Sequence, residues 1–222
     1  MAFEAIDIAA EPEARRELDR LGIPLVPAVV VGDRAVHGWN PNALAELVGA
    51  SYTEPSRLPP AELARRLDQI LAAAQRAIRQ VPPDHLEDAP SQGRDRSARQ
   101  LGYHIFRLSL AFPDAMAQRR LPEAWLQEDA PPDLDDADAV AAYGRTVRER
   151  IGQWLARPDA WDGLVETYYG RQTGHELLER TVWHAAQHVR QLYAFLIRLG
   201  VTLEAPLTDA DFEGLPLPAE IS

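Results

Sequence analysis

Residues 174–199 read GHELLERTVWHAAQHVRQLYAFLIRL, and this stretch decides the fold. Its apolar residues recur at steps of three and four, which is the spacing of one face of an α-helix. Gly200 follows directly and predicts the end of that helix. His184 and His188 are four residues apart, so both imidazoles leave one face, roughly 6 Å apart along the axis. Two ring nitrogens at that spacing can share one divalent metal ion, with bonds of about 2.0–2.1 Å.

Three further stretches have the same periodicity. A first long helix is predicted over 61–81, and a second is predicted to begin after Ser97, which is a suitable N-cap. Pro113 is expected to kink or end that second helix. A third helix is expected to follow the acidic stretch 128–138. Four amphipathic helices of this length favour a mainly α fold, a four-helix bundle with a long connection between the second and third helices.

A third histidine, His104, falls on the apolar face of the second predicted helix. An unsatisfied polar group in a protein core costs about 1–3 kcal/mol, so buried imidazoles need partners, and a metal ion supplies one. Three histidines from two packed helices would leave a coordination position open, which is typical of catalytic metal sites. The alternative from the residues alone is a set of core or surface histidines that are hydrogen-bonded and hold no metal.

Composition excludes several kinds of chemistry. The chain has 222 residues, a net charge of −11 and no Cys, and its 23 basic residues are all Arg. Without Cys there is no thiolate nucleophile or disulfide exchange, and without Lys there is no Schiff base. The negative charge argues against nucleic acid as a partner. The sequence has no apolar run of the ~20 residues that a membrane helix needs and no signal-peptide pattern at its start, so we expect a cytoplasmic protein.

Residues 1–50 differ from the rest and predict the order β-α-β-β-α. We expect a strand over 3–8, a helix over 12–21, an apolar strand within 23–31, a second strand after the turn at 32–34, and a helix over 43–48. A proline-bearing linker over 51–60 would join this segment to the helices of 61–203. Residues 204–222, rich in proline and acid, are expected to form a tail over the surface.

The N-terminal segment resembles the C-terminal half of a glutaredoxin or thioredoxin fold. The resemblance lies in Leu25-Val26-Pro27-Ala28-Val29-Val30-Val31-Gly32-Asp33 followed by Val36-His37-Gly38-Trp39. It implies a cis peptide bond before Pro27 and a thiol cosubstrate held by the backbone at Val26 and Pro27. The half of that fold with the Cys-x-x-Cys turn is missing, so a redox role is excluded. The alternative is a degenerate module that only packs against its neighbour.

The helical part resembles the DinB superfamily, whose members include bacillithiol- and mycothiol-dependent enzymes. The resemblance rests on His104 in the second helix and on His184-x-x-x-His188-x-x-Gln191 in the fourth, and it covers about two-thirds of the chain. It implies an up-down-down-up four-helix bundle in which His104, His184 and His188 bind one divalent metal ion, most often Zn or Ni. Many members have Arg-Gly-Gln where this chain has Val189-Arg190-Gln191, a difference outside the ligands. Related bundles often dimerise, so a homodimer is possible.

From these features we expect a metal-dependent enzyme of the thiol-dependent transferase type. Its partners would be a low-molecular-weight thiol and an electrophile, with the thiol ionised at the open position of the metal site. Two alternatives remain open. One is a non-catalytic metal-binding or stress-response protein with a vestigial or structural site. The other is a metal-dependent hydrolase with water at the open position.

Overall fold

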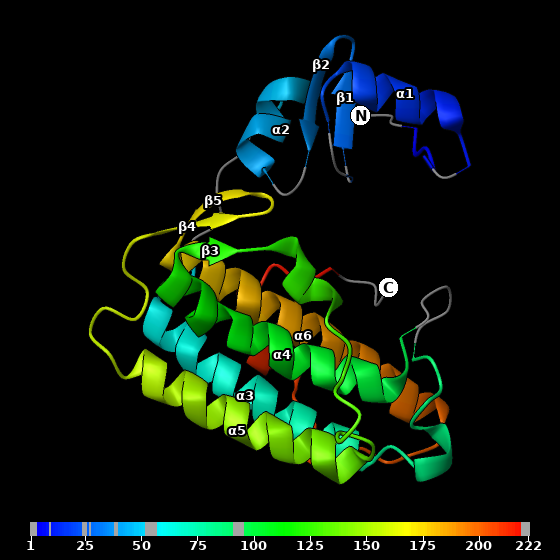
Figure 1. Ribbon diagram of the computed structural model, residues 1–222, viewed down its shortest axis with the longest axis vertical. Coiled ribbons are helices and arrows are strands. Elements are labelled where there is room, and N and C mark those ends of the chain that lie inside the picture. The colour runs from blue at the N-terminus through cyan, green and yellow to red at the C-terminus, as the bar shows by residue number, and fades with distance from the viewer. Residues whose placement is uncertain are drawn as a thin grey trace. The chain divides into compact units, whose positions relative to one another are not determined.

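The computed structural model describes residues 4–8, 10–23, 26, 28–37, 40–51, 57–90 and 96–218. The prediction of a mainly helical chain is confirmed, and two small sheets accompany the helices (Figure 1). The chain divides into two units, Met1–Ser56 and Arg57–Ser222. Among the described residues, no helix combines the length and the apolar character needed to cross a membrane.

The smaller unit contains two helices and a hairpin. Helix α1 (Pro12–Arg20) precedes strands β1 (Ala28–Val31) and β2 (Arg34–His37), and helix α2 (Pro41–Val48) follows them. The two strands are antiparallel, with Val29 opposite Val36. Asn40 caps α2 by accepting a hydrogen bond from the N–H of Ala43 at 3.1 Å.

The strand predicted over 3–8 is not found in its described residues, 4–8. Its alternating pattern favours a strand, but a strand also needs a partner, and the sheet in this unit contains only β1 and β2. The carbonyl of Asp7 instead accepts hydrogen bonds from the N–H groups of Ala10 and Glu11, at 3.0 and 2.9 Å. The backbone therefore turns after Asp7 and enters α1. Val26 lies outside any strand and is 53% exposed, while Pro27 falls outside the described residues, so the thiol contact expected there stays a prediction.

The larger unit contains four long helices, α3 (Pro60–Arg79), α4 (Ala98–Gln118), α5 (Ala137–Leu155) and α6 (Gly174–Arg198). Helix α3 packs against α5, α6 and α4, and α4 also packs against α5 and α6 (Figure 1). Their shared core is apolar. The largest fully buried side chains in it are Phe106, Phe112, Phe195, Leu63, Leu67, Ile70, Leu71, Ile78, Ile105, Leu178, Leu192 and Leu196.

Helix α4 begins where the sequence predicts and ends later. Ser97 caps it by accepting a hydrogen bond from the N–H of Gln100 at 3.2 Å, as expected. Of the two effects predicted for Pro113, a kink or an end of the helix, the end is not found, because α4 continues to Gln118. The proline removes only one hydrogen bond of the helix, and its ring is buried in the core, so packing outweighs the local cost.

Short elements connect the long helices. A 3-10 turn, η1 (Pro83–His85), follows α3, and a second, η2 (Glu123–Gln127), lies between α4 and α5. Strand β3 (Arg120–Leu121) pairs in parallel with β4 (Leu164–Thr167), which pairs antiparallel with β5 (Gly170–Thr173). This sheet ties the start of α6 to the end of α4.

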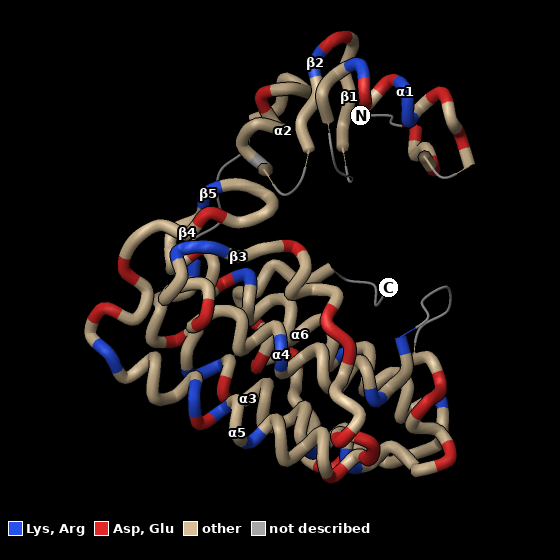
Figure 2. Tube along the Cα trace, in the orientation of Figure 1, with Lys and Arg blue, Asp and Glu red and all other residues tan. Residues whose placement is uncertain are grey.

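Ion pairs between charged side chains connect neighbouring helices at the surface of the larger unit. Arg148 of α5 forms a two-pronged ion pair with Asp68 of α3, both contacts at 2.9 Å, and donates to Gln75. Acidic residues gather where α5 begins (Figure 2), and Asp136 caps that helix through the N–H of Ala139. Negative charge at this position suits the N-terminus of a helix.

The C-terminal residues follow the surface of the larger unit. A short helix, α7 (Asp209–Phe212), lies within them. Arg66 of α3 donates to the carbonyls of Asp211 and Glu213, and the indole N–H of Trp183 donates to the carbonyl of Pro216 at 3.0 Å. This segment therefore covers parts of α3 and α6.

Candidate metal centre

Helix α6 carries two of the three predicted ligands, and its start is firmly fixed. Thr173 and Glu176 form a reciprocal capping box: the Thr173 hydroxyl accepts from the N–H of Glu176, and the Glu176 carboxylate accepts from the N–H of Thr173 at 2.7 Å. Such a cap satisfies two backbone donors that a helix leaves unpaired. Because the helix then runs unbroken to Arg198, His184 and His188 keep their positions on one face.

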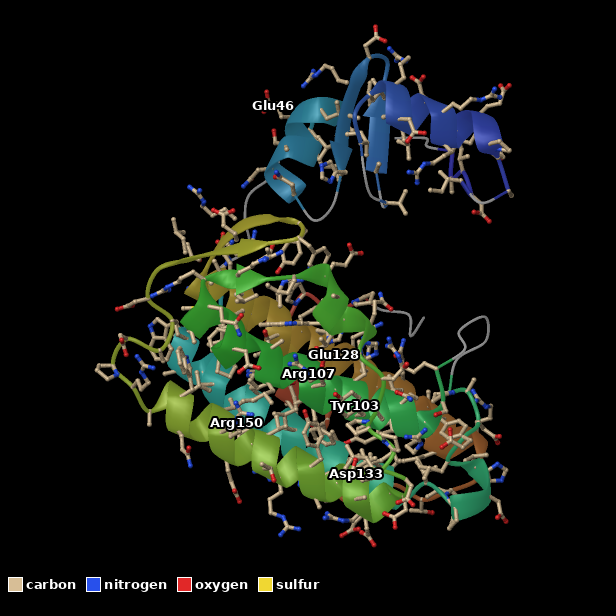
Figure 3. The ribbon with its side chains drawn as sticks, in the orientation of Figure 1. Glu46, Tyr103, Arg107, Glu128, Asp133 and Arg150 are labelled. Atoms are coloured by element: carbon tan, nitrogen blue, oxygen red, sulfur yellow. The ribbon has the colours of Figure 1, made fainter. Side chains whose placement is uncertain are left out.

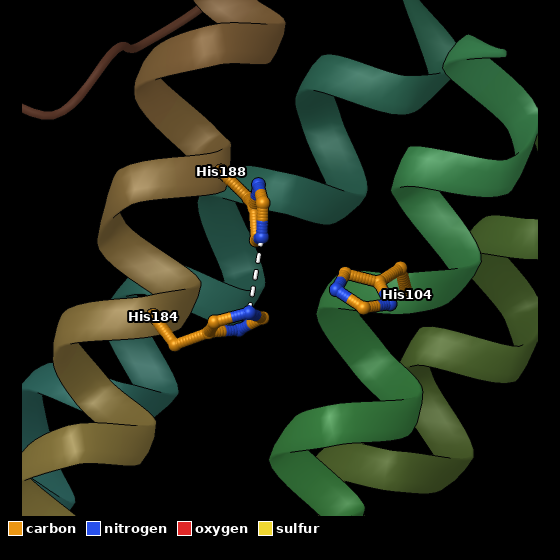
Figure 4. A group of neighbouring side chains, drawn as sticks. All are labelled: His104, His184 and His188. Carbon is orange, nitrogen blue, oxygen red and sulfur yellow. Dashed lines mark hydrogen bonds between the residues drawn. The ribbon is translucent and has the colours of Figure 1, made fainter. Parts of the chain in front are cut away.

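The structure brings His104, His184 and His188 together, as Figure 4 shows. One nitrogen of each ring lies within 4.8 Å of the corresponding nitrogen of the other two. The Nε2 atoms of His184 and His188 are 3.1 Å apart, and the ring of His104 is centred 5.1 Å from each of the other two rings. Two nitrogens bound to one ion at 2.0–2.1 Å in a tetrahedral site are roughly 3.3 Å apart. His184 and His188 are close to that separation at 3.1 Å, and a ring nitrogen of His104 lies within 4.8 Å of both.

Gln191 fixes the orientation of the His188 ring. Its side-chain oxygen lies 2.6 Å from Nδ1 of His188, and both side chains are buried. An amide oxygen only accepts hydrogen bonds, so we assign the proton to Nδ1 of His188. The Nε2 atom then carries the lone pair, and it faces Nε2 of His184 at 3.1 Å. This is the arrangement in which metal-binding histidines are usually held by a second hydrogen bond.

The surroundings of His184 keep its ring neutral. Burial holds the pKa of His184 well below its usual value, and the neighbouring His188 and His104 lower this pKa further, as do Arg180 and Arg96. A neutral imidazole is the form that binds a metal ion, because the lone pair must be free. His184 is thus a neutral nitrogen donor in a positive local field.

A cavity of about 50 Å³ opens beside His184. Five of the residues that line it are apolar: Leu108, Ala111, Leu121, Leu126 and Leu177. The others, besides His184, are Tyr168, Arg180 and Thr181. None of these described lining residues is Asp or Glu, so the walls offer no carboxylate as a general base. The hydroxyl of Thr181 donates to the carbonyl of Leu177 at 2.8 Å and is used within the helix.

Other aromatic and histidine side chains have partners outside the cluster. Tyr103, beside His104 in the sequence, stacks its ring on that of Tyr143, with centres 5.3 Å apart. Figure 3 shows Tyr103 and Arg107 of α4 near Glu128, with which Arg107 forms an ion pair. Nε2 of the partly buried His175 ring lies 2.9 Å from the carbonyl of Leu58. Among the described residues, no acidic or histidine cluster other than the three histidines is arranged to hold a metal ion.

The sequence analysis missed Arg180 and the cavity. A signal for Arg180 was present, because residues 180, 184 and 188 follow one another at steps of four along one helix face. The cavity walls had no such signal, since they come from α4, α6, β3, η2 and the turn between β4 and β5.

No protein-family model matches the chain, and no curated protein matches it.

Replacing Gln191 by Leu is expected to weaken divalent metal binding by about 10–100-fold, the usual effect of losing the group that orients a ligand. The ring of His188 would lose its acceptor at Nδ1 and rotate more freely. Titration calorimetry with Zn²⁺ measures the change. Gln187→Leu is the matched control, because Gln187 is also buried in α6 but pairs with Arg190. Equal affinities for the two variants would show that Gln191 does not position the ligand.

Proposed function

We propose that the larger unit is a four-helix bundle of the DinB type that acts as a metal-dependent enzyme using a low-molecular-weight thiol. The single observation that carries this proposal is the cluster of His104, His184 and His188, three nitrogen donors from two helices within 4.8 Å of one another. Three protein ligands leave room for a further ligand, as in catalytic sites. Zn²⁺ and Ni²⁺ both suit imidazole donors.

The residues present fit such an ion. His184 is a neutral donor, and Gln191 orients the ring of His188. No Asp or Glu is among the described residues that line the cavity, so its wall offers no competing carboxylate ligand. A divalent ion held by these rings would supply positive charge that favours the ionised form of a bound thiol. The chain itself contributes position and exclusion of water, through the buried rings and the apolar cavity beside them.

The absence of cysteine from the sequence supports a thiol from solution. The chain has no sulfur nucleophile of its own, and the described lining of the cavity has no carboxylate to activate water. A hydrolase that uses a general base needs such a group within hydrogen-bond reach. The proposed reaction is therefore a substitution at an electrophilic carbon. The thiol S–H bond breaks and its proton goes to solvent, a sulfur–carbon bond forms, and the bond from that carbon to its leaving group, such as halide, breaks with the electron pair leaving on that group.

The test compares turnover with and without thiols. Protein reconstituted with Zn²⁺ or Ni²⁺ is incubated with an electrophilic aromatic halide and with glutathione, bacillithiol or mycothiol in turn. We expect conjugation that needs both the metal ion and one of the thiols. Turnover of ester substrates without any thiol would favour the hydrolase alternative. Metal binding without either activity would favour a metal-binding or stress-response protein.

A further inference from the structure

Arg180 lies one helical turn before His184 on α6, about 6 Å away along the axis. Its side chain is partly buried and lines the cavity beside His184. The guanidinium lies over the ring of Tyr169, 4.1 Å from its centre, and Nη2 donates weakly to the hydroxyl of Tyr168 at 3.4 Å. These two tyrosines hold the guanidinium plane in place, so the group is positioned before any ligand arrives.

Arg180 has no carboxylate partner among the described residues. Three other partly buried arginines of the larger unit do have one. Arg57 pairs with Glu176, Arg107 with Glu128, and Arg148 with Asp68. A partly desolvated guanidinium is best stabilised by an anion, and the chain has an excess of acidic residues from which one could have come. The guanidinium of Arg180 is therefore placed to bind an anion that the described chain does not supply.

The size and lining of the cavity limit which molecules could carry that anion. Its volume is about 50 Å³, which admits a short group and not a peptide-sized thiol. Its walls are mainly leucine and alanine, which favour a hydrocarbon segment. His184 and Arg180 both line it, one helical turn apart on α6. A molecule that fills it therefore places an apolar segment against the leucine and alanine walls and an anionic group at the arginine.

From this arrangement we infer that the second substrate, the electrophile, is a small short-chain carboxylate whose acid group binds Arg180 and whose apolar segment fills the cavity next to His184. This inference rests on the proposed function for the role of substrate, and on Arg180 and the cavity for the chemical class. The planar guanidinium matches a carboxylate with two parallel hydrogen bonds. A phosphate carries more charge and needs more donors, and the Thr181 hydroxyl already donates within the helix.

The test measures binding of non-reactive probes by calorimetry, on metal-free and on Zn²⁺-treated protein. The probes are the straight-chain acids from propanoate to hexanoate, each compared with its uncharged amide. We expect at least one acid to bind at least tenfold more tightly than its amide. The variant Arg180→Gln should remove that preference, and Arg180→Lys should keep only part of it, because it retains the charge but loses the two parallel hydrogen bonds and the stacking on Tyr169. Arg145→Gln is the matched control, since Arg145 is exposed on α5 and lies outside the cavity lining.

The outcomes separate this inference from the proposed function. Equal binding of acid and amide, no binding of either, or an unchanged preference in Arg180→Gln would overturn the inference even if the protein binds metal and uses a thiol. A preference that appears only with Zn²⁺ and survives in Arg180→Gln would place the carboxylate on the metal, which also overturns it. Failure to bind metal would count against the proposed function, while the acid preference of metal-free protein would still test Arg180. A thermal melt of each variant shows that the fold is kept.

Discussion

Replacing His188 by Ala is expected to reduce the affinity for Zn²⁺ or Ni²⁺ by more than 100-fold. Loss of an orienting group alone costs 10–100-fold, and this change removes a ligand itself. His104→Ala and His184→Ala should act alike, because the three rings supply one donor each within 4.8 Å. Metal content after dialysis, measured by elemental analysis, is expected to fall from about one ion per chain to none.

Melting temperature provides a second measurement. A ligand that binds only the folded state stabilises it by about 2.7 kcal/mol when its concentration is 100 times the dissociation constant. Added Zn²⁺ should therefore raise the melting temperature of the wild-type protein and leave that of His188→Ala unchanged. His85→Ala is the control, because His85 is partly exposed and pairs with Asp88 at 2.7 Å, outside the cluster. Full metal content in all three ligand variants would contradict the proposed centre.

A second large effect is expected at the contact between α4 and α5. Gly144 of α5 lies against Phe106 of α4, and a Cβ atom added there would be only 2.5–2.7 Å from three atoms of the Phe106 ring. Phe106 is fully buried and lies two residues after His104. Its ring also meets that of Tyr143, with centres 6.5 Å apart, and has little space to move. Gly144→Ala should therefore lower the free energy of unfolding despite the better helix propensity of Ala.

The size of the effect follows from two opposing terms. Overpacking a filled core costs about 1–3 kcal/mol, and Ala in place of Gly in a helix contributes about 1 kcal/mol in the other direction. The matched control lies in the same helix: Gly152 is exposed and has no atom within 4 Å of an added Cβ. Gly152→Ala should stabilise the protein by about 0.5–1 kcal/mol. Urea unfolding of both variants tests the difference in sign, and equal stabilities would show that Phe106 can move aside.

The long helices could be predicted because their signal is local. The steps of three and four in residues 174–199 mark one face of α6, and the cap at Ser97 marks the start of α4. The pairing of His184 with His188 follows from the same periodicity. The contact of His104 with His184 and His188 depends on how α4 packs against α6. The only indication of this contact in the sequence was that His104 falls on the apolar face of its own helix.

The sheet of β3, β4 and β5 could not be predicted in this way. Strand β3 has two residues, and its partner β4 begins more than 40 residues later, so neither shows a pattern of its own. The opposite error occurred at residues 4–8, where alternation favoured a strand that has no partner in the sheet described. The cavity depends on side chains from five separate segments and has no sequence pattern at all.

Arg180, His184, His188 and Gln191 all lie on one continuous helix, α6. Several of the residues that line the cavity lie instead in the segments that connect the long helices. Leu121 belongs to β3, Leu126 to η2, and Tyr168 to the turn before β5. Substitutions in these loops can reshape the cavity without altering the spacing of the histidines on α6. Under the proposed function, the preference for different electrophiles can therefore be changed in variants of this chain while the histidine cluster is kept.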